Sequence, residues 1–154
     1  MIPESKYIEN EITVRKMRVS GDVLLTRKSM VRWLALSLGL ISPNESRQMM
    51  IDLLDVLLTF HFKGEEPTSS EIIGALKKKK KELGEKNEKA VRYHLTQLVK
   101  KGILVSNNRK YSFARGDYPN DSLAPAMERM FADRMDESFK NIRKIVETIE
   151  KTEK

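Results

Sequence analysis

Two segments that lie close together in this sequence carry side chains suited to binding a polyanion. They span residues 87–101 and 109–110, and they combine lysine and arginine with residues that form hydrogen bonds. Lysine and arginine bind phosphate oxygens, and arginine, hydroxyl and amide groups also bind base edges in the major groove of DNA. The candidate groove contacts are Arg92, Tyr93, Thr96 and Gln97. The candidate phosphate contacts are Lys89, Lys100, Lys101, Arg109 and Lys110.

The positive charge of the chain is concentrated around these segments. The formal net charge is +7, but residues 77–115 alone hold thirteen Lys/Arg against three Asp/Glu. Residues 117–154 hold seven Lys/Arg against nine Asp/Glu, so the C-terminal part is slightly acidic. A surface that serves only solubility spreads its charge, whereas a nucleic-acid-binding surface concentrates it. The simpler alternative is a soluble protein that happens to be basic.

A helix must position the first segment. We expect it to cover residues 87–101, with Asn87 as its N-cap and Gly102 as its C-terminal stop. Its apolar residues recur at three- and four-residue spacing, so they form one buried face and leave the polar residues on the other. The residues of the buried face are Val91, Leu95, Leu98 and Val99.

A β-hairpin must position the second segment. Residues 103–105 and 110–113 are two short β-prone runs on either side of Asn107 and Asn108. Asparagine tolerates positive φ and is common in tight hairpin turns. This arrangement predicts Arg109 and Lys110 near the tip of the hairpin.

Two further helices are expected upstream. Ser42 and Glu45 form a capping-box pattern at the start of a helix that runs to residue 62. Thr68 and Glu71 repeat the pattern for a helix that contains five consecutive lysines, residues 77–81, and that we expect to stop near Gly84. On the first of these helices we interpret Asp52 and Asp55 as a solvated face and His61 as a packed core histidine.

The N-terminal part is expected to be an extended arm or strand followed by an apolar helix. Residues 7–25 place isolated apolar side chains among charged ones. Residues 28–40, which include Trp33, leave little polar face, so that helix should be buried or lie at an interface.

The last predicted element is a long helix over residues 122–154. Met135, Ile142 and Ile149 are seven residues apart, as in a coiled-coil seam. Because a lone helix cannot keep such a stripe in water, it must pair with a second chain or pack on its own domain, and we favour pairing. The candidate dimerisation residues are Phe131, Met135, Ile142, Ile145 and Ile149.

Several classes of protein are not indicated. The chain has no cysteine, which excludes disulfides and thiolate metal sites and fits a reducing, cytoplasmic location. The N-terminus lacks a signal-peptide pattern, and the most apolar stretch, residues 30–41, is too short to span a membrane. The only histidines are His61 and His94, and no nucleophile or phosphate-loop motif accompanies them. We therefore expect no enzyme activity, no metal and no cofactor.

The motifs of the central region resemble winged helix-turn-helix transcriptional regulators of the archaeal and bacterial type. They are Thr68-x-x-Glu71-Ile72, Val91-Arg92-Tyr93-His94-Leu95-x-x-Leu98-Val99-x-x-Gly102-Ile103-Leu104 and Tyr111-Ser112-Phe113. The resemblance implies that the helix ending at Gly102 enters the major groove and that the hairpin, or wing, contacts phosphates or the minor groove. One departure from the family is the lysine-rich stretch between Leu76 and Val91, which is longer than a tight helix-turn-helix allows.

The expected fold is mainly α with a small β-hairpin, arranged in three parts. Residues 1–42 form an arm and an apolar helix, residues 43–116 a winged-helix DNA-binding domain, and residues 117–154 a dimerisation helix. The function expected is sequence-specific binding of double-stranded DNA by a homodimeric transcriptional regulator, with an unidentified effector ligand left open. The alternative is a winged-helix protein-interaction module in a larger transcription, replication or RNA-processing assembly, because fold alone does not settle function.

Overall fold

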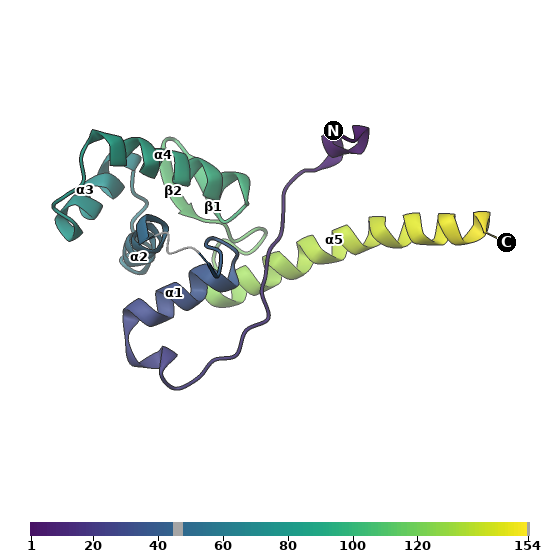
Figure 1. The fold of residues 1–154 in the computed structure, drawn as a ribbon, viewed down its shortest axis with the longest axis horizontal. Coiled ribbons are helices and arrows are strands. Elements are labelled where there is room, and N and C mark those ends of the chain that lie inside the picture. The colour runs from purple at the N-terminus through teal and green to yellow at the C-terminus, as the bar shows by residue number, and fades with distance from the viewer. Residues whose placement is uncertain (45–47, 154) are drawn as a thin grey trace. The chain divides into compact units, whose positions relative to one another are not determined.

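A computed structural model describes residues 1–44 and 48–153 of the chain. The described part is mainly helical with one small antiparallel hairpin, as the sequence predicts (Figure 1). The helices are η1 Pro3–Tyr7, η2 Val23–Leu25, α1 Arg27–Ser37, α2 Gln48–Phe62, α3 Ser69–Lys79, α4 Glu85–Lys100 and α5 Leu123–Thr152. The strands are β1 Leu104–Asn107 and β2 Lys110–Phe113. The chain divides into two compact units, Met1–Phe113 and Ala114–Lys154, and each is described by itself.

Helix α2 is the centre of the first unit. It contacts α1, α3, α4 and β2, and Figure 1 shows it between α1 and the α3–α4 pair. Leu53 and Leu54 are fully buried because α2 is apolar on nearly every side. The neighbouring elements complete the core with Ile72 and Leu76 of α3, Leu95 and Leu98 of α4, and Leu104 of β1.

The start of α3 matches the sequence prediction. The Thr68 hydroxyl accepts a hydrogen bond from the Glu71 backbone N–H, and the Glu71 carboxylate accepts one from the Thr68 N–H, which completes a capping box. The capping box predicted for Ser42 depends on Glu45, which lies outside the described residues. Thr68 is therefore the N-cap at which α3 begins.

The boundary between α3 and α4 differs from the prediction at both ends. Helix α3 ends at Lys79 rather than near Gly84, because the chain turns there and brings two lysines to α2. Gly84 is the N-cap of α4, and Asn87 lies in the first turn, where its Oδ1 accepts a 3.2 Å hydrogen bond from the Gly84 N–H. An asparagine can accept a hydrogen bond from a backbone N–H at the start of a helix either as the N-cap or from the first turn. Its presence alone therefore does not locate the cap.

Helix α4 ends at the predicted glycine. Gly102 has φ of +72°, a conformation that favours glycine. The N–H of Gly102 bonds to Val99 O and that of Ile103 bonds to Leu98 O, both at 3.0 Å. These two bonds satisfy carbonyls at the end of α4 and direct the chain into β1.

The hairpin is joined by a third segment of chain. Strands β1 and β2 pair with Leu104 opposite Phe113 and Asn107 opposite Lys110. Thr68, just before α3, forms an isolated antiparallel bridge with Lys110, and the Tyr111 N–H donates a 2.8 Å bond to Pro67 O. The hairpin is therefore attached to the start of α3 as well as to the end of α4.

The N-terminal arm is extended but forms no strand within residues 8–20, so the arm alternative holds and the strand alternative is wrong. The Arg15 guanidinium donates to Leu36 O and Ile41 O at 2.6 and 2.9 Å, and the Trp33 Nε1–H donates to Arg18 O at 2.9 Å. These bonds hold the arm against α1 and the residues that follow it. Trp33 is consequently half-buried beside the arm.

The second unit consists of a short linker and α5. Leu123, Ala126 and Met130 are buried, whereas the helix is exposed from residue 139 onward. The Tyr118 hydroxyl donates a 2.7 Å hydrogen bond to Asp133, and this bond is the main reason that the pKa of Tyr118 is raised. Among the described residues, every helix is too short or too polar to form a membrane-spanning segment.

Candidate nucleic-acid interface

Helix α4 has a buried face and an exposed face. Val91, Leu95 and Leu98 are at most 1% exposed, as the sequence predicts, whereas Val99 is only half-buried. The exposed face carries five of the seven candidate side chains that lie on α4 and its C-cap, namely Lys89, Arg92, Tyr93, Thr96 and Lys100. Tyr93 is 61% exposed although it is aromatic. The face is therefore open to a large partner.

Arg92 and Thr96 are oriented by hydrogen bonds within the unit. The Arg92 Nη1 donates to the Ser69 hydroxyl of α3 at 2.8 Å. The Thr96 hydroxyl donates to Arg92 O, one helical turn earlier, at 3.0 Å. Each side chain keeps hydrogen-bonding capacity, because guanidinium has five N–H donors and a hydroxyl has two acceptor lone pairs. The sequence did not indicate this role of Ser69, because its place in a capping run already explained a serine.

Gln97 and Lys101 lie at the edge of this face. Gln97 is half-buried, and Lys101 Nζ donates a 3.2 Å hydrogen bond to Gly39 O at the end of α1. Both line a cavity of about 240 Å³ together with Lys100 and the arm residues Ile8, Asn10 and Glu11. The structure thus groups them with the arm rather than with the centre of the exposed face.

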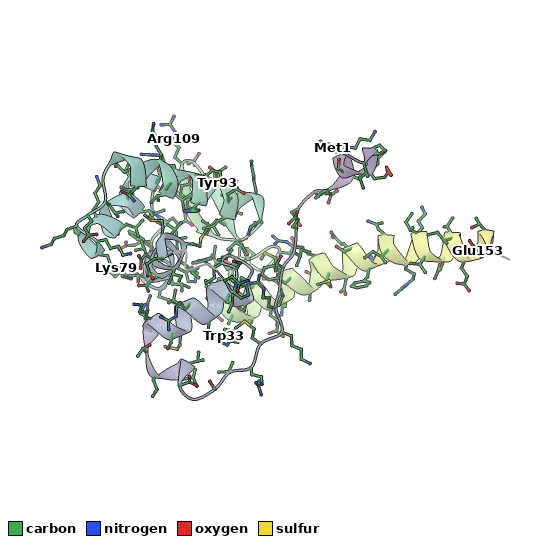
Figure 2. All side chains as sticks on the ribbon, viewed as in Figure 1. Met1, Trp33, Lys79, Tyr93, Arg109 and Glu153 are labelled. Carbon is green, nitrogen blue, oxygen red and sulfur yellow. The ribbon has the colours of Figure 1, made fainter. Side chains whose placement is uncertain are left out.

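The hairpin presents its two cations at an exposed tip. Asn108 and Arg109 have φ of +52° and +63°, the backbone signature of a two-residue type I′ turn. Leu104 and Phe113 are buried at the base, whereas residues 105–110 are exposed. Figure 2 shows Arg109 on the same side of the first unit as Tyr93.

The cations of this helix and hairpin contrast with paired lysines elsewhere in the first unit. Among the described residues, none of Lys89, Lys100, Arg109 and Lys110 forms an ion pair. Arg92 likewise forms no ion pair with a side chain that the structure describes, and its Nη1 bonds to the neutral Ser69 hydroxyl. The surface formed by the exposed face of α4 and the hairpin tip is called the α4–hairpin surface below.

The lysine run at the end of α3 behaves differently. Lys80 Nζ lies 2.7 Å from Asp52 Oδ2, and Lys79 forms an ion pair with Asp55, which also binds Arg27 Nε at 2.5 Å. Asp52 is 7% exposed and the Asp55 side chain is 17% exposed, so our interpretation of these aspartates as a solvated face is wrong. The physical reason is that a buried carboxylate needs a cation, and the lysine run supplies one.

Lys77 forms a third contact of this kind. Its Nζ lies 3.3 Å from Glu88 Oε1 on α4, which connects α3 to α4 through side chains that are both partly exposed. The run therefore links α3 to α2 and to α4. A cavity of about 500 Å³ lies beside these pairs, lined by charged residues that include Arg27, Lys28, Asp52, Asp55, Lys79 and Lys80.

The histidines take part in aromatic contacts. His61 is half-buried with edge-to-face ring contacts to Phe62 at 5.2 Å and Phe113 at 5.6 Å, and His94 lies 5.9 Å from the Tyr93 ring. Among the side chains that the structure describes, no group of three His, Asp or Glu is arranged to hold a metal ion.

Comparisons of the chain with protein-family models, with curated proteins and with solved structures gave no match. The assignment of a function therefore depends on the geometry and the charge of the α4–hairpin surface and of α5.

Proposed function

We propose that this protein binds double-stranded DNA through the α4–hairpin surface and acts as a homodimeric transcriptional regulator. The observation that carries the proposal is the row of cations on α4 and the hairpin tip, which form no ion pair with any side chain that the structure describes. The lysines at residues 77, 79 and 80, in contrast, are paired. An uncompensated cationic surface attracts a polyanion, because binding releases the counterions condensed on the phosphates.

The order of elements supports a winged-helix arrangement. The chain runs from α2 through the bridged segment at Thr68 to α3, α4 and the β1–β2 hairpin. This is the order of a helix, a short strand, two helices and a wing. An α-helix is narrow enough to enter the major groove, which is about 12 Å wide. In this proposal α4 enters the groove and the hairpin tip contacts the backbone or the minor groove.

The side chains on the surface divide into two proposed roles. Arg92, Tyr93 and Thr96 present guanidinium, phenol and hydroxyl groups to base edges, and Gln97 would join them from the edge of the face. The lysines and Arg109 bind phosphates, which positions the protein without reading sequence. Lys101 contributes least in this arrangement because its ammonium group already binds Gly39 O.

The test begins with a selection of genomic fragments by the purified protein, followed by binding measurements on the selected duplex at several salt concentrations. The logarithm of the affinity should fall with the logarithm of the salt concentration, with a slope of about −0.9 for each phosphate contacted. Failure to retain any duplex, or an affinity that does not respond to salt, contradicts the proposal.

Two single variants separate base reading from phosphate binding. Arg92→Ala should reduce the difference in affinity between selected and scrambled duplexes. Lys110→Ala should weaken binding to both duplexes by the same factor and lower the salt slope by about 0.9. If Arg92→Ala weakened binding to the selected and the scrambled duplex by the same factor, as expected for Lys110→Ala, Arg92 would read no base.

The homodimer part of the proposal is supported by α5. All five predicted dimerisation residues lie on this helix, and Met135, Ile142, Ile145 and Ile149 are 40–59% exposed. Large apolar side chains that recur in this way mark an association surface. Sedimentation equilibrium should give twice the 17.8 kDa mass of one chain, and a single-chain mass at all concentrations contradicts the dimer.

The same exposed residues of α5 also favour a second candidate, a protein-interaction module in a larger assembly. In that case α5 binds a different protein, and the protein has no affinity for duplex DNA. The two candidates give opposite results in the duplex-binding and mass measurements above.

A further inference from the structure

Helix α5 carries two apolar stripes that point in different directions. Its buried side chains, Leu123, Ala126 and Met130, are spaced three and four residues apart. Continuing this stripe at the same spacing leads to polar residues, namely Asp133 or Arg134, Glu137 and Asn141. The exposed stripe begins instead at Met135, five residues after Met130, so it belongs to another face of the helix. A separate partner must cover that second face.

The exposed stripe has the spacing of a coiled coil. It runs Met135, Phe139, Ile142, Val146 and Ile149, and each side chain is 40–56% exposed. The steps alternate between four and three residues, an average of about 3.5, which keeps a stripe facing one partner helix. In heptad terms, Met135, Ile142 and Ile149 occupy d positions, and Ala132, Phe139 and Val146 occupy a positions.

The two flanks of the stripe differ in charge. The e positions on one flank are Arg129, Asp136, Arg143 and Glu150, so the sign of the charge alternates at each heptad. The g positions on the other flank are Phe131, Ser138, Ile145 and Thr152, none of which is charged. This asymmetry determines which orientation of two identical helices gives ion pairs.

We propose that α5 pairs with α5 of a second copy of this chain in an antiparallel orientation. In a parallel pair, the e flank of one helix meets the g flank of the other, so its charges face uncharged residues. Reversing one helix brings the two e flanks together. The alternating signs then allow Asp136 to pair with Arg143 of the second copy, and the two-fold symmetry gives this ion pair twice.

The alternating charges also select one register. When Asp136 faces Arg143 of the second copy, Phe139 packs against Ile142 of the second copy and Met135 packs against Val146 of the second copy. Ala132 lies opposite Ile149 of the second copy at each end, so all six layers are apolar. A shift by one heptad brings Asp136 opposite Asp136 of the second copy, where like charges repel. In this register Arg129 would face Glu150 of the second copy. Arg129 already bonds to Asp121 at 2.8 Å. The register is therefore selected by the two central pairs of Asp136 and Arg143.

This inference depends on the homodimer in the proposed function but not on DNA binding. Two charge-reversal variants, Asp136→Arg and Arg143→Asp, test it without DNA. Each variant alone places like charges opposite each other at both central pairs, so its dimer dissociation constant should rise about 30-fold. A mixture of the two variants restores both ion pairs and should form heterodimers in preference to either homodimer.

Native mass spectrometry of the mixture distinguishes the outcomes, because the two variants differ in mass. A predominant heterodimer supports antiparallel pairing. Variants that each dimerise as tightly as the unaltered protein, with heterodimers at the statistical proportion, overturn it in favour of a parallel pair. An unaltered protein that stays monomeric overturns the inference together with the homodimer.

Distance measurements give a second test that does not depend on weakening the dimer. The chain has no cysteine, so Lys140→Cys and Lys151→Cys each provide one site for a spin label. In the antiparallel register the two Lys151 positions lie about 30 Å apart along the helix axis, whereas the two Lys140 positions lie nearly level. Electron paramagnetic resonance should therefore give a clearly longer distance at residue 151, and equal short distances at both sites overturn the proposal. A protein that passes these tests but binds no duplex would disprove the proposed function alone.

Discussion

The lysines at the end of α3 and the cations of the α4–hairpin surface have the same charge but opposite structural roles. Lys79 and Lys80 bind Asp55 and Asp52 of α2, and Asp52 is almost completely buried. Lys89 and Lys110 are exposed and, within the part of the chain that the structure describes, form no ion pair. Figure 2 shows Lys79 on a different side of the first unit from Tyr93 and Arg109.

This difference shows that a count of charges overstates the binding surface. The five-lysine run is the densest positive segment of the sequence, yet three of its members balance acids on α2 and α4. The cations that remain available are more widely spaced in the sequence and come together only through the helix and the hairpin. We therefore expect the unpaired cations to affect duplex binding and the paired lysines to affect the stability of the fold.

The largest expected effect comes from neutralising two unpaired cations. Lys89→Gln with Lys110→Gln should weaken duplex binding about 30-fold near physiological salt and lower the salt slope by about 1.8, if each lysine binds one phosphate. The matched control is Lys79→Gln with Lys80→Gln, which removes the same charge from the paired group. Fluorescence anisotropy should show less than a twofold loss for the control, and equal losses in both variants would contradict the distinction.

The control variant should instead lose stability. Without Lys80 the Asp52 carboxylate is left buried without its cation, so the free energy of unfolding should fall by about 1–2 kcal/mol. The estimate is modest because the Lys80 side chain is 42% exposed, and solvent screens the pair. Urea denaturation should show no comparable loss for Lys89→Gln with Lys110→Gln. Adding Asp52→Asn to the control variant should recover most of the stability.

A single change at the hairpin tip should move stability and binding in opposite directions. Arg109 has φ of +63°, which costs free energy for any residue with a Cβ. Arg109→Gly should raise the free energy of unfolding by about 0.5–1 kcal/mol, because glycine suits a type I′ turn. It should also weaken duplex binding about fivefold through loss of one phosphate contact. Arg109→Lys, which keeps the charge, should change neither quantity substantially.

The smallest expected effect concerns the orientation of Arg92. Ser69→Ala removes the hydroxyl that accepts the 2.8 Å hydrogen bond from Arg92 Nη1. An exposed hydrogen bond contributes about 0.5 kcal/mol, so duplex affinity should change about twofold, with Ser70→Ala as the neighbouring control. A loss as large as that of Arg92→Ala would mean that Ser69 itself contacts DNA.

The sequence predicted the elements of the first unit well because their signals are local. The spacing of Val91, Leu95 and Leu98 identified the buried face of α4, and Gly102 identified its end. The capping box at Thr68 and the hairpin around Asn108 are also encoded within a few residues. Each of these features depends on neighbours in sequence, which is why periodicity and turn chemistry were sufficient.

The errors arose where distant residues meet. Asp52 and Lys80 are far apart in the sequence, so nothing local showed that one would neutralise the other. The hydrogen bonds from Lys101 to Gly39 and from Arg92 to Ser69 also join residues far apart in the sequence. The first of these, and the cavity that groups Gln97 and Lys101 with the arm, explain why the nine candidate contacts do not form one uniform surface. Asn87 was misplaced for a different reason, because asparagine and glycine are both favoured at the N-cap and Gly84 takes that position.

The attachment of the arm has a kinetic consequence. Within residues 9–22, the Arg15 N–H is the backbone amide that bonds to another backbone group, at 2.7 Å to Ser37 O. Amide hydrogens that bond only to water exchange with solvent rapidly, whereas an amide in a protein hydrogen bond exchanges only when that bond opens. Arg15 should therefore give one slow signal within a rapidly exchanging segment. Its exchange rate reports directly how often the arm separates from the end of α1.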